Sequence, residues 1–221
     1  LARREFLGGS GAALLAGVAA VQASSGAAAA GRGRLRVRFG VLTDAHIGTE
    51  WMKGINNAAV KKALEFFKAR GVDAVAATGD MANNGYIWQL EEFAGIWNEV
   101  FPGGRGIGGK KVEKLFIAGN HELSTWLARE KQSPEKHIAP NVEKVWQRCF
   151  GEEYSPVWHK EINGIQFVGA NWTVAPGGPY RKEDIEGALA EAGRRARKED
   201  PVFHLRHAPP ARTCWGSREG A

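Results

Sequence analysis

The sequence predicts an α/β protein that is built around a parallel sheet. Three short runs rich in apolar residues, 35–42, 73–78 and 112–118, alternate with two stretches whose apolar residues recur at helical spacing, 54–70 and 86–100. This alternation is typical of parallel strands joined by crossover helices. Hydrophobic residues make up 43% of the 221 residues and charged residues 24%, ordinary values for a globular protein with one good-sized core.

The first thirty residues resemble an export signal of the bacterial twin-arginine type. Two arginines near the start are followed by Phe6-Leu7 and by a weakly apolar stretch rich in glycine and alanine. This stretch is too short and too weakly apolar for a stable transmembrane span. We therefore expect residues 1–30 to be a signal and linker, read by the twin-arginine export machinery, and residues 31–221 to be a domain that works in the periplasm or outside the cell. A disordered arm is the alternative.

The net charge of +6 is partly local. Arginines flank the apolar segment at positions 3, 4, 32, 34, 36 and 38, and a second basic run covers residues 194–198. We interpret these groups as part of the signal, a solvated strand edge and a solvated helix end that the helix dipole stabilises. Binding of nucleic acid is the less favoured alternative.

The three predicted strands all end in residues that can bind metal ions. The blocks that follow them are, in order, Asp44-Ala45-His46, Gly79-Asp80 and Gly119-Asn120-His121-Glu122. In a βαβαβ arrangement the carboxyl ends of the strands lie at one edge of one sheet, where ligands bind. An extended backbone would aim Asp44 and His46 in the same direction. Asp80 could offer one oxygen to each of two cations.

Beyond the third strand the sequence predicts four further elements. They are a helix that Asn141 caps and that runs through Phe150 to a closing Gly151, a hairpin of strands 157–162 and 165–170 around Asn163-Gly164, a charged helix over 181–199, and a strand that leads to His207. An Asn-Gly pair between two alternating runs is a strong signal for a two-residue hairpin turn.

Together the blocks resemble the calcineurin-like metallophosphoesterase family. The family pattern is Asp-x-His, Gly-Asp, Gly-Asn-His followed by Asp or Glu, a lone His, and finally Gly-His-x-His. The first three blocks are present in order, and His207, before Ala208-Pro209-Pro210, is the best match to the lone His. His204 is a weaker candidate because it lies within the predicted strand. The resemblance implies a two-sheet β-sandwich flanked by helices, with the hairpin in the second sheet.

The last block of the family, Gly-His-x-His, does not occur in these 221 residues. It should follow the segment that contains His207 and the two prolines. We expect that the block lies beyond Ala221 in a longer protein, so that the domain is C-terminally incomplete here.

The resemblance implies a site for two divalent or trivalent metal ions. Asp44, His46 and Asp80 would hold the first ion, and Asp80, Asn120 and His207 the second. Oxygen and imidazole ligands without a thiolate suit Mn, Fe or Zn. The two cysteines, Cys149 and Cys214, have no metal-ligand spacing, and we interpret them as buried thiols.

The activity that the resemblance implies is hydrolysis of phosphate monoesters or diesters by a metal-activated water. His121 would act as the general acid, and a neighbouring carboxylate, Asp44 or the less favoured Glu122, would keep it protonated. The alternative is a non-catalytic metal-binding or protein-interaction domain on the same fold, for which the absent last block is the only argument. A nuclease that uses the basic surface is a third hypothesis. The sequence leaves the substrate, the metal and the oligomeric state open.

Overall fold

The structure is a computed structural model, and it describes residues 35–49, 54–123, 133–173 and 180–209. The segment interpreted as an export signal, residues 1–30, lies outside these ranges, as does Cys214. Within the described ranges, no helix combines the length and the apolar character that crossing a membrane requires.

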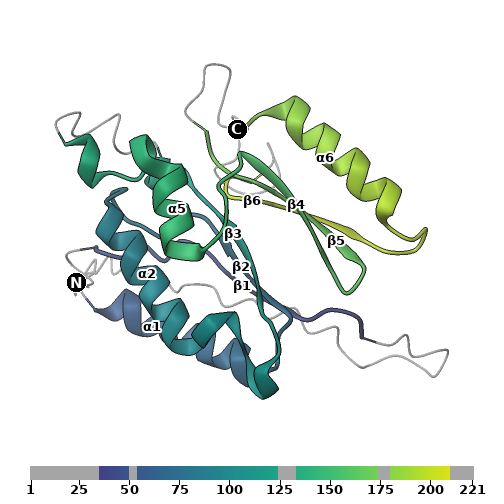
Figure 1. Cartoon of the computed structure of the whole chain (residues 1–221), viewed down its shortest axis with the longest axis horizontal. Helices are drawn as coiled ribbons and strands as arrows, with labels where there is room; N and C mark the ends of the chain where they lie inside the picture. Colours follow the sequence, from purple (N-terminus) through teal and green to yellow (C-terminus); the bar gives the residue numbers. More distant parts are fainter. Residues whose placement is uncertain (1–34, 50–53, 124–132, 174–179, 210–221) are drawn as a thin grey trace, which may run out of the picture.

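The first sheet is parallel and carries its strands in the order β1-β2-β3 (Figure 1). The strands are β1 (Phe39–Leu42), β2 (Ala74–Thr78) and β3 (Glu113–Ile117). Helix α1 (Ile55–Ala69) joins β1 to β2, and helix α2 (Ile87–Val100) joins β2 to β3. The predicted βαβαβ order is therefore confirmed, and the carboxyl ends of all three strands lie at one edge.

The second sheet has the order β4-β5-β6. Strands β4 (Val157–Ile162) and β5 (Ile165–Ala170) are the predicted antiparallel hairpin, and β6 (Val202–Arg206) pairs with β5 in parallel. The turn residues Asn163 and Gly164 have φ values of 53° and 80°. Two consecutive left-handed residues are what a type I′ hairpin turn requires, and asparagine and glycine adopt this conformation most readily.

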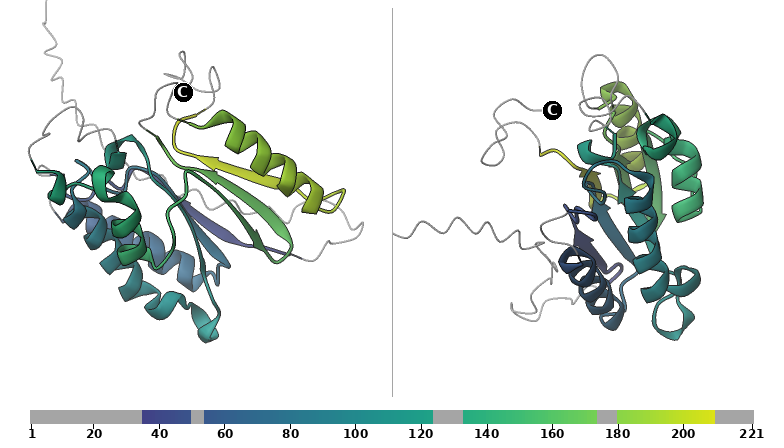
Figure 2. Two further views of the ribbon diagram at one scale, coloured as in Figure 1. Left: turned by 45° about the horizontal axis from the view of Figure 1, so that its top comes forward. Right: turned by 90° about the vertical axis from the view of Figure 1, so that its left-hand side faces the viewer.

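The remaining helices and turns lie outside the two sheets. They are the helices α3 (Asn120–Leu123), α5 (Val142–Phe150) and α6 (Lys182–Arg195), and the 3₁₀ turns Pro102–Gly104, Ile107–Gly109, Pro134–Lys136 and Ala139–Asn141. Figures 1 and 2 show α1, α2 and α5 on one side of the sheets and α6 on the other.

The two sheets pack face to face, which gives four layers in the order helix, sheet, sheet, helix. Alternate residues of β2 face opposite ways: Ala74 and Ala76 contact the second sheet, whereas Val75 and Ala77 face α1 and α2. All six residues of β5 are buried, because the first sheet covers one of its faces and α6 the other. The structure thus has the predicted two-sheet sandwich flanked by helices.

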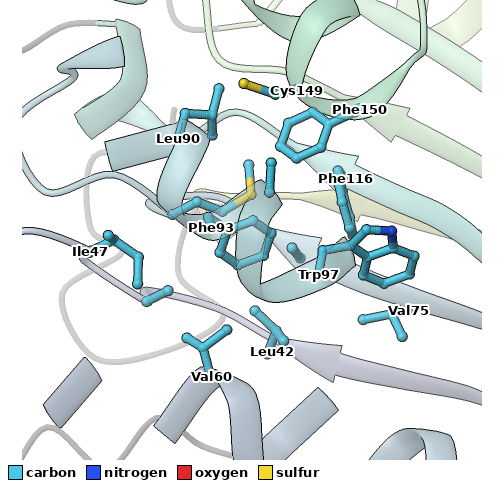
Figure 3. Close-up of a cluster of buried hydrophobic side chains, with 14 of the residues drawn as sticks. Leu42, Ile47, Val60, Val75, Leu90, Phe93, Trp97, Phe116, Cys149 and Phe150 are labelled. Atoms are coloured by element: carbon cyan, nitrogen blue, oxygen red, sulfur yellow. The ribbon is translucent and has the colours of Figure 1, made fainter. Parts of the chain in front are cut away.

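The larger core lies between the first sheet and its helices, and an aromatic cluster forms its centre (Figure 3). Phe116 of β3 makes edge-to-face contacts with Phe93, Trp97 and Phe150, at centroid distances of 5.7, 5.1 and 5.0 Å. These rings come from three elements, α2, β3 and α5, so the cluster joins α5 to the βαβαβ unit. Cys149 is buried beside it, as predicted.

Two boundaries differ from the sequence prediction. The first strand begins at Phe39 rather than at residue 35, because Phe39 pairs with Ala74, the first residue of β2, and earlier residues have no partner strand. Helix α6 ends at Arg195, four residues before the predicted end at 199. The basic residues of its last turn pair with Glu191, as expected of a solvated helix end.

The predicted cap of α5 is also wrong in its detail. Asn141 precedes the helix, but its side chain makes no capping hydrogen bond. Its amide Nδ2 instead donates to the carbonyl oxygens of Pro134 and His137, at 2.6 and 3.0 Å. Gly151 closes the helix in the left-handed conformation, as predicted.

Candidate metal centre

The loops that follow the three strands of the first sheet are joined to one another beyond the strand ends. The N–H of Asp44 donates to the carbonyl oxygen of Gly79 (3.1 Å), and the N–H of His46 donates to that of Asp80 (2.9 Å). The N–H of His121 donates to the carboxylate Oδ1 of Asp80 (2.9 Å). The second loop is therefore bonded to both neighbours, and its Asp80 lies in the middle of the site.

The backbone of these loops is not extended. Asp44, His46 and Asp80 have φ values of 55°, 44° and 52°, all in the left-handed region that non-glycine residues rarely adopt. The prediction that an extended backbone aims Asp44 and His46 in the same direction is wrong. Their side chains still converge, with Nε2 of His46 3.6 Å from Oδ1 of Asp44, because the chain curls around the strand end. Such strained residues cluster at functional sites.

His46 also approaches the central carboxylate. Its Nε2 lies 3.8 Å from Oδ2 of Asp80, a residue whose side chain is 5% exposed. The structure thus brings together the three side chains that the resemblance assigns to the first metal: Asp44, His46 and Asp80.

His207 and Asn120 lie on the other side of Asp80. Nδ1 of His207 contacts the carbonyl oxygen of Thr78 at 2.9 Å, and Nε2 lies 3.0 Å from Oδ1 of Asn120 and 3.2 Å from Oδ2 of Asp80. Because a carbonyl oxygen can only accept, Nδ1 carries a proton and Nε2 is the nitrogen that faces the site. The three residues assigned to the second metal are therefore also together, and His207, not His204, is the residue at the site.

His121 is the third imidazole of the cluster. Its Nδ1 is hydrogen-bonded to the carbonyl oxygen of Asn83, and its Nε2 lies 3.9 Å from Oδ2 of Asp80. Its ring meets that of His46 edge to face, with the centroids 4.6 Å apart. The carbonyl group of Asn83 therefore orients the predicted general acid.

Two overlapping groups of side chains have the geometry to hold a cation. They are His46, Asp80 and His121, and Asp44, Asp80 and His207; in each group the nearest donor atoms lie within 4.8 Å of one another. Only Asp80 belongs to both. The division differs from the two ligand sets that the resemblance implies, although every residue of those sets lies at the site.

The carboxylates and imidazoles shift one another's pKa. Burial alone would lower the pKa of His207, but the hydrogen bond and charge of Asp80 raise it to about 9. The hydrogen bond to Asp44 raises the pKa of His46. Burial opposes ionisation of Asp44, yet hydrogen bonds from His46 and Thr43 hold its pKa below the ordinary value. The cluster of negative charge thus attracts protons to its imidazoles, and it would attract a metal ion in the same way.

Glu122 is a further carboxylate at the site, and it is completely buried. Burial, and next the nearby charge of Asp80, raise its pKa to about 7, against the opposing effect of backbone N–H donors. Its carboxylate contacts main-chain N–H groups, a role that the sequence does not indicate.

The residues present fit a metal centre. Their donors are carboxylate and amide oxygens and imidazole nitrogens, which suit Mn, Fe or Zn. Among the described residues, the buried Nδ1 of His46 has no hydrogen-bond partner, so protein groups alone do not satisfy this ring. Binding of a metal would displace the protons from the site-facing nitrogens, because histidine must be neutral to be a ligand.

Two glycines allow the close approach of the loops. A Cβ atom at Gly119 would lie 2.7 Å from the backbone nitrogen of Asp80 and closer still to its Oδ1, and one at Gly79 would clash with the ring of His207. No other residue type fits at these positions without moving a side chain that faces the site.

Gly119→Ala should therefore reduce stability and disturb the centre. Forcing an extra carbon against main-chain atoms costs about 1–3 kcal/mol of the free energy of unfolding, measured by urea denaturation. The matched control is Gly95→Ala, since a Cβ at Gly95 in helix α2 meets nothing within 4 Å. The control should be stabilised by about 0.5–1 kcal/mol. Equal urea midpoints for Gly119→Ala and the wild type would contradict the close approach.

Comparison with known protein families identifies the family of this chain. A model of the family described as calcineurin-like phosphoesterase matches residues 37–220. The chain therefore belongs to the calcineurin-like phosphoesterase family. No curated protein gives a match to the sequence.

Two similar solved structures are a dimetal phosphatase from Danio rerio and a protein of unknown function from Aquifex aeolicus. Each is 12% identical to this chain. The first match covers 77% of this chain and 69% of that one at a TM-score of 0.47. The second covers 76% of this chain and 88% of that one at a TM-score of 0.34.

His137 and His159 have contacts outside the cluster. His137 is buried and its ring packs on Tyr86 at a centroid distance of 4.6 Å. His159 on β4 contacts Oε1 of Gln166 at 2.7 Å. We therefore interpret both histidines, and Tyr86, as structural residues.

Proposed function

We propose that this protein hydrolyses phosphate monoesters or diesters at a centre that holds two metal ions. The observation that carries the proposal is the position of Asp80, whose carboxylate is shared by both groups of potential ligands. Dinuclear hydrolases hold their two cations about 3.5–4 Å apart, and one carboxylate can bind both cations at this distance. Membership of the calcineurin-like phosphoesterase family supports the reaction class.

The ligand roles follow the resemblance. Asp44, His46 and Asp80 would hold one ion, and Asp80, Asn120 and His207 the other. When bound, the ions would supply a hydroxide at neutral pH and neutralise charge on the phosphoryl oxygens.

His121 would donate a proton to the departing alkoxide. Its Nδ1 proton is engaged by the carbonyl oxygen of Asn83, so the proton in transit would be the one on Nε2. Nε2 lies 3.9 Å from Oδ2 of Asp80, nearly the same distance as Nε2 of His46 at 3.8 Å. In this proposal Nε2 of His121 would face the phosphate ester rather than bind an ion.

Removal and restoration of metal test the proposal. Protein treated with a chelator should lose hydrolysis of p-nitrophenyl phosphate and bis-p-nitrophenyl phosphate, and Mn²⁺, Fe²⁺ or Zn²⁺ should restore it. Elemental analysis of the active protein should find two metal equivalents. Hydrolysis that survives the chelator would contradict the proposal, and bound metal without hydrolysis of any ester would favour the non-catalytic alternative.

A further inference from the structure

The side chain of Glu122 lies inside the protein and contacts main-chain groups of two loops. Its Oε2 accepts hydrogen bonds from the N–H groups of Asp80 (3.0 Å) and Gly119 (2.7 Å). Its Oε1 accepts one from the N–H of Ala82 (2.6 Å). Glu122 itself lies in the short helix α3, directly after the third strand, and is 0% exposed.

A charged group is costly to bury unless hydrogen bonds compensate for its lost hydration. Three main-chain donors provide this compensation, and hydrogen bonds to a carboxylate are stronger than those between neutral groups. A second carboxylate joins the same two loops. Asp80, in the loop after the second strand, accepts a hydrogen bond from the N–H of His121, which follows the third strand. The second and third loops are therefore bonded to each other through two carboxylates.

The main chain that Glu122 contacts includes Asp80, one of the three left-handed non-glycine residues of the site. Gly79 and Asp80 have φ values of 103° and 52°. A left-handed aspartate persists only where its surroundings hold it, because the conformation is intrinsically unfavourable. Without the carboxylate of Glu122, the N–H of Asp80 would be buried and unpaired, and the loop would be free to relax to an ordinary backbone conformation.

We propose that Glu122 is a positioning residue for the metal centre: its carboxylate holds the main chain of Asp80 and Gly119 so that Asp80 points between His46 and His207. The inference rests on the proposed function in one respect, that the group to be bound here is a metal ion. Glu122 itself would touch neither the metal nor the substrate, because main-chain N–H groups occupy its carboxylate.

Glu122→Gln is the informative variant, because glutamine has the shape of glutamate and keeps one acceptor oxygen. Its other group is an amide N–H₂, which cannot accept a hydrogen bond from the main-chain N–H that it would face. Its matched control is Asp73→Asn at the opposite end of strand β2. Asp73 is also a buried carboxylate, and it accepts the N–H of Arg38 (2.7 Å) and the side-chain amide of Asn163 (2.9 Å). Both variants remove a charge that is bonded to the main chain, but only one lies at the site.

The first readout is the affinity for Mn²⁺ alone, measured by electron paramagnetic resonance, with thermal unfolding of the metal-free proteins in parallel. Loss of a residue that orients ligands typically weakens metal binding roughly 10–100-fold. We expect a loss in this range for Glu122→Gln, with kcat lowered and KM nearly unchanged at saturating metal. Asp73→Asn should keep the wild-type affinity for Mn²⁺ even if its melting temperature falls as far as that of Glu122→Gln. A Glu122→Gln protein that is folded and binds Mn²⁺ like the wild type would overturn the proposal, as would an equal loss in Asp73→Asn.

Amide hydrogen exchange of the metal-free wild type gives a second test, which does not depend on whether a variant folds. The N–H groups of Asp80, Ala82 and Gly119 should exchange much more slowly than that of the exposed Gly108. Exchange at the same rate would overturn the proposal. A wild-type protein that binds no Mn²⁺ would overturn the proposed function instead, and the exchange rates would still decide whether Glu122 holds these loops.

Discussion

Asp80→Asn should lower phosphoesterase activity by roughly 1000-fold and leave the fold intact. Two bound cations would contribute several kcal/mol to transition-state stabilisation, and each 1.4 kcal/mol corresponds to a factor of ten in rate. Asp80 is the only member shared by both ligand groups of the described residues, so its charge would matter to both proposed ions.

The fold should survive because asparagine retains the oxygen that Asp80 uses in the structure. Oδ1 accepts the N–H of His121, and an amide oxygen can do the same. Removal of the charge also relieves its repulsion with buried Glu122. Initial rates with p-nitrophenyl phosphate and urea unfolding without metal measure the two effects.

Asp184→Asn is the control for this substitution. Asp184 forms an exposed ion pair with Arg181 in the first turn of α6 and belongs to neither ligand group, so its loss should change neither rate nor stability noticeably. Wild-type activity in Asp80→Asn would exclude the proposed mechanism. A collapse of stability in that variant would show instead that the charge of Asp80 serves the fold.

Phe116→Ala should have the largest effect on stability, about 3–5 kcal/mol of the free energy of unfolding. The ring is 3% exposed and contacts three other aromatic rings, from α2 and α5. Truncation removes the buried apolar surface and leaves a cavity that rigid neighbours fill only in part.

Urea denaturation measures the change, and Phe66→Ala serves as the matched control. Phe66 lies on α1 and is 38% exposed, with Arg70 over its ring. Its truncation should cost less than about 1 kcal/mol. Similar losses for the two variants would mean that the aromatic cluster around Phe116 does not carry the stability that its burial implies.

Some features of the fold have local signals in the sequence, and others do not. The βαβαβ order, the hairpin at Asn163-Gly164 and the two-sheet sandwich were all predictable. Local signals are sufficient for the first two: apolar runs of strand length alternate with helical patterns, and an asparagine and a glycine in sequence accept the left-handed turn. The second sheet followed from family resemblance, since no local pattern says which faces of two sheets will meet.

The prediction that the side chain of Asn141 caps α5 is wrong. A capping asparagine is a statistical preference, and here nearby carbonyl oxygens of Pro134 and His137 compete successfully for the same amide. The early start expected for the first strand failed because a strand extends only as far as its partner, and β2 begins at Ala74.

By itself, the sequence determined which side chains meet at the site. Parallel strands in a βαβαβ unit must end at one edge, so Asp44, Asp80 and Asn120 converge whatever the details of their loops. Only the tertiary structure decided how they are held. The left-handed backbone at Asp80, the carbonyl group that orients His121 and the three N–H groups that contact Glu122 all depend on where main-chain donors and acceptors come to lie. Every residue has these groups, so the sequence carries no local signal for them.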